Sequence, residues 1–205
     1  GMTAHQPYET LRVHDGVEVR RYPEHVLAET TVEAGFEDAG NRAFRILFGY
    51  ISGTNQAEQK VAMTAPVLQD APSESIAMTA PVLQEDADVY PDGTGRGRFR
   101  VAFVLPEGFT LENAPRPTDS RVRLRRVPST VAAAIRFRGR WSQANYRKHL
   151  EKLRTALRAE NLSPVGPPRF ARFDPPFKPW FLRRNEIVLS LQDPVDPPSP
   201  PEKRR

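Results

Sequence analysis

The chain has 205 residues, a formal net charge of +5 at pH 7 and no cysteine. The lack of cysteine excludes disulfides, thiolate catalysis, a zinc ribbon and thioether attachment of a cofactor. No stretch approaches the ~18 consecutive apolar residues of a membrane-spanning helix, and the first residues form no apolar run typical of a signal peptide. We therefore expect a cytoplasmic domain that is long enough to bury a core.

The first third of the chain predicts two strands followed by a helix. Residues 17–22 and 26–32 are rich in β-branched side chains and are expected to pair as a hairpin across Pro23. Residues 36–51 place apolar side chains at the i, i+3, i+4, i+7 spacing of an amphipathic helix. Gly53 marks its expected end.

A sequence of eight residues, Ala-Met-Thr-Ala-Pro-Val-Leu-Gln, occurs at 62–69 and again at 77–84. Each copy is expected to form a short strand at a sheet edge or bulge, because proline has no N–H to donate to the ladder. Its methionines, Met63 and Met78, either fill gaps in the core or line a cleft for a large apolar ligand. The glycine-rich residues 86–97 predict a loop.

The second half predicts four strands and one helix, at 99–105, 122–127, 131–137, 142–160 (the helix) and 186–191. At 121–125 arginines alternate with valine and leucine, which places charge on the solvent side of a strand. This favours a solvated sheet face over a nucleic-acid surface, although the positive charge favours anionic ligands. We expect no nucleic-acid partner, and we expect the proline-rich tail at 193–205 to be disordered.

The chain also repeats itself over a longer distance. Three pairs of residues recur at a constant offset of 105 positions: Arg21 with Arg126, Pro23 with Pro128, and Phe36 with Trp141. Each copy reads as strand, turn, strand and helix, so we predict an internal duplication with repeats at about 16–105 and 121–192. The predicted fold class is α+β, with one antiparallel sheet curling around and a helix from each half packed on it.

Five motifs stand in one order along the chain: Tyr-Glu-Thr-Leu at 8–11, Val-Glu-Val-Arg-Arg-Tyr at 17–22, Gly-Thr-Asn at 53–55, Ala-Met-Thr-Ala-Pro-Val at 62–67, and Asp-Pro-Pro-Phe-Lys-Pro-Trp at 174–180. In this order they resemble the SOUL haem-binding family, and the doubled motif is similar to its bacterial members. The resemblance implies a single domain at 8–192. It also implies a distorted antiparallel β-barrel built from two pseudo-two-fold repeats, each with a long helix.

The resemblance further implies non-covalent binding of haem or a related tetrapyrrole, as a carrier, buffer or sensor. The implied site uses one side of the first helix, the methionines of the doubled motif and the loop near 178, with the residues Arg42, Phe44, Leu47, Phe48, Met63, Met78, Lys178 and Trp180. Arg42 and Lys178 would face the propionates of the ligand. Core packing is the alternative for the helix residues, and a solvated charge is the alternative for the two cations.

The axial position of the iron has no obvious ligand in this sequence. Some family members carry a histidine just before the tyrosine of the second strand, where this chain has Arg21, which cannot donate a lone pair to iron. His14 and His25 border strand turns and are expected to be exposed to solvent. The sequence therefore predicts binding without a strong protein ligand.

No pattern for catalysis stands out. The sequence has no Ser-His-Asp motif, no metal-spaced histidine pair and no glycine-rich phosphate loop, so we expect no enzyme. Two alternatives stay open, a module that binds small effector molecules and a hydrolase acting in the same cleft. A buried glutamate in the cleft would favour the hydrolase.

Overall fold

The computed structural model describes residues 4–56, 75–89 and 95–192 of the chain. The tail at 193–205, the first copy of the doubled motif and its Met63 lie outside these ranges. The elements of the first half are β1 (Ala4–His5), β2 (Glu9–His14), β3 (Val17–Tyr22), β4 (His25–Gly35), α1 (Phe36–Ser52), β5 (Asn55–Gln56), β6 (Thr79–Ala80), β7 (Val82–Val89) and β8 (Arg96–Val104). Those of the second half are β9 (Arg116–Pro117), β10 (Arg123–Val127), β11 (Thr130–Arg138), α2 (Gln143–Ala159), β12 (Pro164–Arg172), the 3-10 helix η1 (Trp180–Leu182) and β13 (Arg184–Leu191).

The large sheet has nine antiparallel strands in the order β10-β4-β8-β7-β12-β13-β11-β3-β2. When β2 is left out, the strand order is symmetric about the β7–β12 pair. Counted from the two ends inward, β10, β4, β8 and β7 occupy the same places as β3, β11, β13 and β12. Each half contributes strand, strand, helix, strand, strand, and the halves meet where β7 pairs with β12. The α+β class and the large antiparallel sheet are therefore present, while the internal duplication itself stays a prediction.

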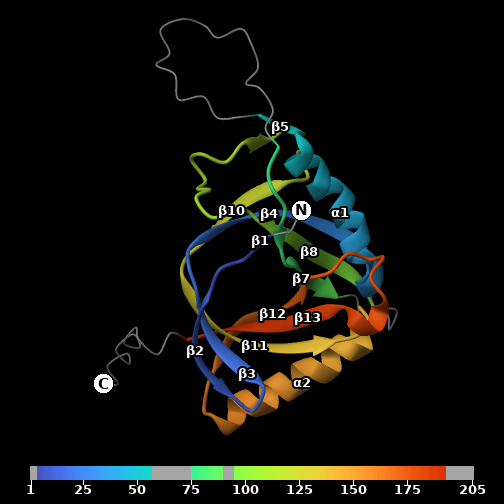
Figure 1. Ribbon diagram of the computed structural model, residues 1–205. Coiled ribbons are helices and arrows are strands. Elements are labelled where there is room, and N and C mark those ends of the chain that lie inside the picture. The colour runs from blue at the N-terminus through green and yellow to red at the C-terminus, as the bar shows by residue number, and fades with distance from the viewer. Residues whose placement is uncertain (1–3, 57–74, 90–94, 193–205) are drawn as a thin grey trace, which may run out of the picture.

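Two expectations about strand pairing are wrong. β3 and β4 do not form a hairpin, because β3 pairs with β11 of the other half and β4 pairs with β10 and β8. The proline-marked turn between them moves the chain from one half of the sheet to the other. The first strand of each half, β3 or β10, therefore pairs with a strand of the other half. The expected barrel is also not closed. Within the ranges that the structure describes, β10 and β2 remain the edges of a strongly curved sheet (Figure 1).

The second copy of the doubled motif supplies β6 and the start of β7. We expected an edge strand here, but β7 is central and pairs with both β8 and β12. Pro81 is no obstacle, because it stands between β6 and β7 and outside both ladders. The loop expected at 86–97 is shorter than predicted, since β7 continues to Val89 and β8 begins at Arg96.

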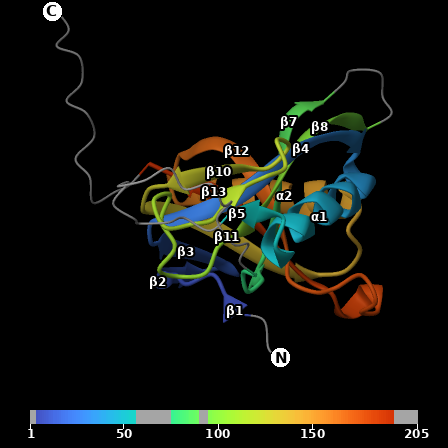
Figure 2. The ribbon, with the colours of Figure 1, turned by 90° about the horizontal axis from the view of Figure 1, so that it is seen from above.

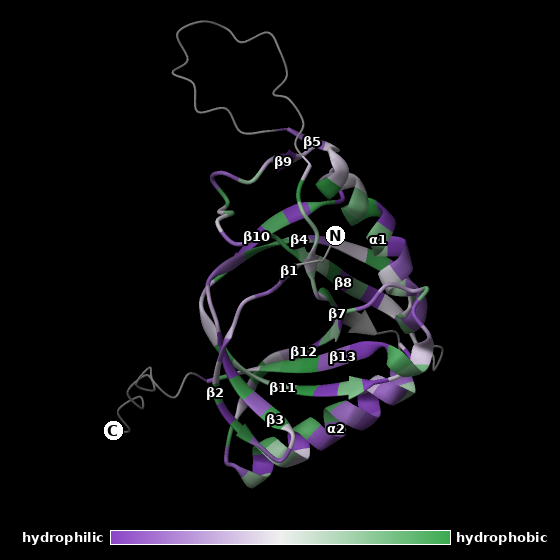
Figure 3. Cartoon of the chain, in the orientation of Figure 1, coloured by the Kyte–Doolittle hydropathy of each residue, from purple (hydrophilic) through white to green (hydrophobic). Residues whose placement is uncertain are grey.

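The core lies between one face of the sheet and the two helices, whose predicted positions are confirmed. Both Figure 1 and Figure 2 place α1 and α2 toward one side of the sheet and the edge strands β10 and β2 toward the other. Both helices have one apolar and one polar side (Figure 3). Ser142 caps α2 as expected, its Oγ accepting a hydrogen bond from the backbone N–H of Asn145 at 3.1 Å.

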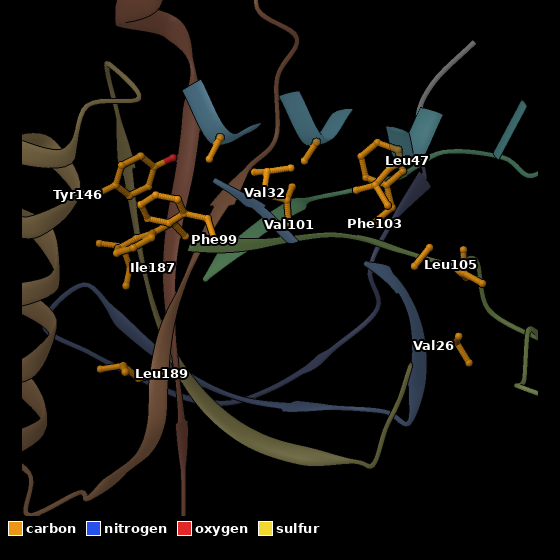
Figure 4. Packing of buried hydrophobic residues seen from close by; sticks show 14 of the residues in the cluster. Val26, Val32, Leu47, Phe99, Val101, Phe103, Leu105, Tyr146, Ile187 and Leu189 are labelled. Atoms are coloured by element: carbon orange, nitrogen blue, oxygen red, sulfur yellow. The ribbon is translucent and has the colours of Figure 1, made fainter. Parts of the chain in front are cut away.

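Aromatic side chains join the two halves of this core. Phe36 at the start of α1 makes edge-on contacts with Tyr146 of α2 and Phe170 of β12, with ring centroids 5.5 and 5.2 Å apart. Phe99 of β8 and Ile187 of β13 lie beside Tyr146 in the same buried cluster (Figure 4). No helix in the described part of the chain is long and apolar enough to cross a membrane.

Candidate functional site

The concave face of the sheet, which is the face opposite the helices, carries a cavity of about 860 Å³. Strand pleating divides the side chains between the two faces, since successive residues point to opposite sides. In β13, Ile187 and Leu189 join the helix-covered core, whereas Glu186, Val188 and Ser190 line the cavity. Strands of both halves contribute to the wall, so the cavity lies where the halves meet.

Part of the wall is apolar. Leu27 of β4 and Leu83 of β7 belong to a buried cluster that packs with Val127 and Phe173. Val188 of β13 packs in a second cluster with Tyr22 and Tyr8. Both halves of the sheet therefore offer apolar surfaces to a ligand.

A network of buried charges supports one side of the cavity. Arg20 is fully buried, and its Nη1 and Nη2 donate to Glu186 Oε1 and Oε2 at 2.8 and 2.6 Å. Arg136 Nε donates to Glu186 Oε2 at 2.8 Å, and the Arg136 guanidinium also contacts the Tyr8 hydroxyl. Burial opposes the charge of Arg20, but hydrogen bonds and the charge of Glu186 outweigh it and hold the pKa of Arg20 above its usual value.

A second arginine in the wall has no such partner. The Nη1 of Arg169 donates to Ser190 Oγ at 2.9 Å. Glu85 lies across from it on β7 and its charge acts on the guanidinium, but among the described residues no carboxylate forms an ion pair with Arg169. Burial lowers the pKa of Arg169, yet a guanidinium remains protonated in proteins. Arg169 therefore keeps donors and charge available for an anionic group in the cavity.

His25 at the start of β4 also lines the cavity, which corrects the expectation that it is exposed. Its ring is half-buried, with Nδ1 at 2.8 Å from the carbonyl oxygen of Pro23 and Nε2 at 3.3 Å from the side-chain nitrogen of Gln6. Burial lowers the pKa of His25, and the charge of Arg169 lowers it further, although the hydrogen bond to Pro23 acts in the opposite direction. His14, in contrast, is exposed as predicted.

The residues that the sequence assigned to the helix side of the site lie outside this cavity. Phe44 and Phe48 are partly exposed on α1, their rings stacked with centroids 5.6 Å apart. Leu47 is fully buried in the core, and Met78 packs against that core from its edge. Arg42 is exposed and donates to the carbonyl oxygen of Glu33 at 3.0 Å.

Lys178 and Trp180 lie together in a second, shallower depression of about 490 Å³ near the first turns of α1 and α2. Lys178 pairs with Asp174 at 2.9 Å, and Trp180 stacks with the guanidinium of Arg140. Burial would raise the pKa of Asp174, but hydrogen bonds from Arg184 and Lys178 outweigh it and lower the pKa to about 2. Neither Phe44 nor Phe48 lines this depression, so the structure separates the predicted residues into two groups.

The cavity on the concave face was not predicted from the sequence, although part of its pattern is present there. The alternation of arginine with apolar residues at 121–125 does place Leu124 against the core and Arg125 on the other face. The arginines of this segment are exposed as expected, but the face that carries them also forms part of the cavity wall, at Arg125. In the described part of the chain, no group of three or more His, Asp or Glu side chains is arranged to hold a metal ion.

Comparisons with known proteins place these features in a family. A family model described as "SOUL heme-binding protein" matches residues 3–190. The chain is 27% identical over 176 residues to heme-binding protein 1 of Xenopus tropicalis, covering 84% of this chain and 83% of the relative. It is 26% identical over 155 residues to heme-binding protein 1 of Sus scrofa, covering 75% and 71%.

Solved structures share the fold at low sequence identity. The EcmrR C-terminal domain has a TM-score of 0.59 and 10% identity, covering 91% of this chain and 98% of that chain. A hydrolase from Listeria innocua has a TM-score of 0.53 and 14% identity, covering 89% and 94%. At such identities the likeness concerns the fold alone.

Proposed function

The chain belongs to the SOUL heme-binding protein family, and we propose that it binds haem or a related tetrapyrrole non-covalently in the cavity on the concave face, as a carrier, buffer or sensor. One observation carries the choice of site: the cavity combines apolar walls with an arginine, Arg169, that forms no ion pair within the described part of the chain. Its volume of about 860 Å³ is typical of small-molecule sites.

The residues present fit the chemistry of a tetrapyrrole. The ring is flat and apolar, and Leu27, Leu83 and Val188 supply surfaces of that kind from both halves. The carboxylates of the ligand need cations, and the Arg169 guanidinium can hold one of them through a charge-assisted hydrogen bond. Thioether attachment is excluded by the lack of cysteine, so binding would be non-covalent.

The stacked pair of Phe44 and Phe48 on α1 is the alternative location, and two variants separate it from the cavity. Val127→Trp places a large ring at the cavity wall, whereas Phe48→Ala removes half of the exposed aromatic pair. Both are titrated with hemin, following the Soret band, after circular dichroism has verified that each variant is folded.

We expect saturable binding at micromolar hemin for the unmodified protein and for Phe48→Ala, and a strong loss of affinity for Val127→Trp. Loss in Phe48→Ala with retention in Val127→Trp would move the site to α1. The absence of a saturable shift in the unmodified protein would remove the tetrapyrrole function altogether.

We propose that the cavity binds without catalysing a reaction, although it does contain a buried glutamate. Both oxygens of Glu186 accept hydrogen bonds from the guanidinium groups of Arg20 and Arg136, and these three bonds occupy most of its roughly four acceptor positions. A general base must reach the proton that it accepts with a free lone pair. The second carboxylate of the wall, Glu85, is likewise engaged by Arg100 at 2.5 Å. An ester-hydrolysis assay in which Glu186→Gln abolished a measurable rate would contradict this view.

A further inference from the structure

We propose that His25 provides the axial ligand to the iron of a haem bound in the cavity, through its Nε2 atom. This inference rests on the proposed function. It assigns a ligand that the sequence did not offer, because the position occupied by Arg21 cannot serve.

The hydrogen bonds of the ring define which nitrogen is available. The carbonyl oxygen of Pro23 can only accept, so the Nδ1 atom of His25, 2.8 Å away, carries the proton and donates it. The lone pair is then on Nε2. Histidines that bind metals are usually oriented in this way, with one nitrogen donating to a carbonyl and the other free to coordinate.

The partner of Nε2 in the present structure is one that a ligand can replace. The side-chain amide of Gln6 donates to Nε2 at 3.3 Å, a long hydrogen bond from a flexible side chain that itself lines the cavity. The backbone of Gln6 is held separately, its N–H donating to the carbonyl oxygen of Ala80 at 2.8 Å. The amide can therefore turn away while the chain around it keeps its position.

The position of His25 within the cavity agrees with the rest of the proposed site. It borders Leu27, the next cavity-facing residue of β4, and it pairs across the sheet with Val127 of the same apolar wall. The charges of Arg169 and Arg125 act on the imidazole from the neighbouring wall. A ring whose iron lay at Nε2 would thus have apolar contacts and a cation for its carboxylate within one cavity.

The other histidines are less suited to this role. His14 and His149 do not line the cavity, and the Nε2 atom of His14 already contacts a carboxylate oxygen of Glu160 at 3.0 Å. His5 lines the cavity and lies beside Phe173, with ring centroids 6.1 Å apart. No hydrogen bond that fixes the orientation of its ring is found among the described residues. Judged by the contacts of the described residues, His25 is the histidine that combines a place in the wall with a defined tautomer.

The test uses two ligands that differ only in the metal: hemin and metal-free protoporphyrin IX. Each is titrated into the full chain, into His25→Ala and into His14→Ala, which serves as the matched control at an exposed histidine. We expect the unmodified protein and His14→Ala to give the absorption and electron paramagnetic resonance spectra of a histidine-ligated ferric haem. In His25→Ala this signature should disappear, with hemin affinity falling by more than about tenfold.

Protoporphyrin IX keeps the inference falsifiable, because it occupies the same space without an iron to coordinate. Its affinity should change by less than about twofold in His25→Ala, and added imidazole should restore the ligated spectrum of hemin. Equal weakening of both ligands, or an unchanged hemin spectrum in His25→Ala, would overturn the role of His25 and leave the proposed function intact. Failure of the unmodified protein to bind either ligand would overturn the proposed function itself.

Discussion

Replacing Arg20 by methionine removes the central cation of the buried network beside the cavity. The side chain has no exposed surface, and its guanidinium donates to both oxygens of Glu186, to Glu18 at 2.8 Å and to the hydroxyl of Tyr22 at 2.8 Å. Methionine fills a similar volume but leaves these acceptors without their donor. We expect the folded state to lose stability because a buried carboxylate then lacks most of its compensation.

The magnitude follows from what remains around Glu186. Removing one partner of a buried ion pair costs about 3–5 kcal/mol of unfolding free energy. Because Arg136 still donates to Glu186 in the variant, we expect the lower end, about 3 kcal/mol, which corresponds to a decrease in Tm of about 6–12 °C for a chain of this length. Arg136→Met is the matched control: its side chain is 61% exposed, and the expected cost is about 1 kcal/mol or less.

Urea unfolding followed by circular dichroism measures both variants under the same conditions. We expect the urea midpoint of Arg20→Met to lie clearly below that of Arg136→Met. If the two midpoints coincided, or if Arg20→Met cost less than about 1 kcal/mol, the buried pair of Arg20 and Glu186 would not stabilise the fold. A double variant, Arg20→Met with Glu186→Leu, should be no less stable than Arg20→Met alone, because it leaves no buried carboxylate behind.

Three further predictions concern other parts of the fold. Leu47→Ala should cost about 2–5 kcal/mol in urea unfolding, whereas Phe48→Ala, at a side chain that is 46% exposed, should cost much less; equal costs would contradict the assignment of Leu47 to the core. Gly40→Ala places a Cβ atom 1.9 Å from Nη1 of Arg172, so the Tm of this variant should fall because the guanidinium is displaced. An unchanged Tm would show that the Arg172 side chain can move aside without cost. Because the pKa of Asp174 is lowered to about 2, the stabilising effect of its carboxylate is complete above about pH 4 and is lost as the pH falls toward 2. The difference in urea midpoint between the unmodified protein and Asp174→Asn should therefore narrow below pH 4. A difference that stayed constant would argue against the ion pairs of Asp174 with Lys178 and Arg184.

The features that the sequence predicted correctly are those encoded by neighbouring residues. Both helices follow from apolar side chains repeated every three or four positions, and the cap of α2 follows from a single serine at 142. The family likeness also rests on short motifs that can be read directly. Local patterns of this kind need no knowledge of which strands become neighbours.

The features that were missed depend on residues far apart in the chain. The pairing of β3 with β11 joins residues more than a hundred positions apart, and a hairpin across Pro23 was the simpler local reading. Arg20 and Glu186 are 166 positions apart, so their ion pair could not be predicted from the residues next to either of them in the sequence. Alternation along a strand separates two faces, but it does not tell whether the polar face meets solvent or the wall of a cavity.

The two faces of the sheet explain how one domain can hold a rigid core and an adaptable cavity. In β13 the side chains of Ile187 and Leu189 stabilise the packing of the helices, while Val188 between them faces the cavity. Substitutions at the cavity-facing positions can therefore alter what is bound without creating voids in the core. Glu186 is the exception, because its ion pair with Arg20 makes one cavity-lining residue part of the buried network that holds β3, β11 and β13 together. Ligand binding should consequently be easier to alter without loss of stability at Ser190 than at Glu186.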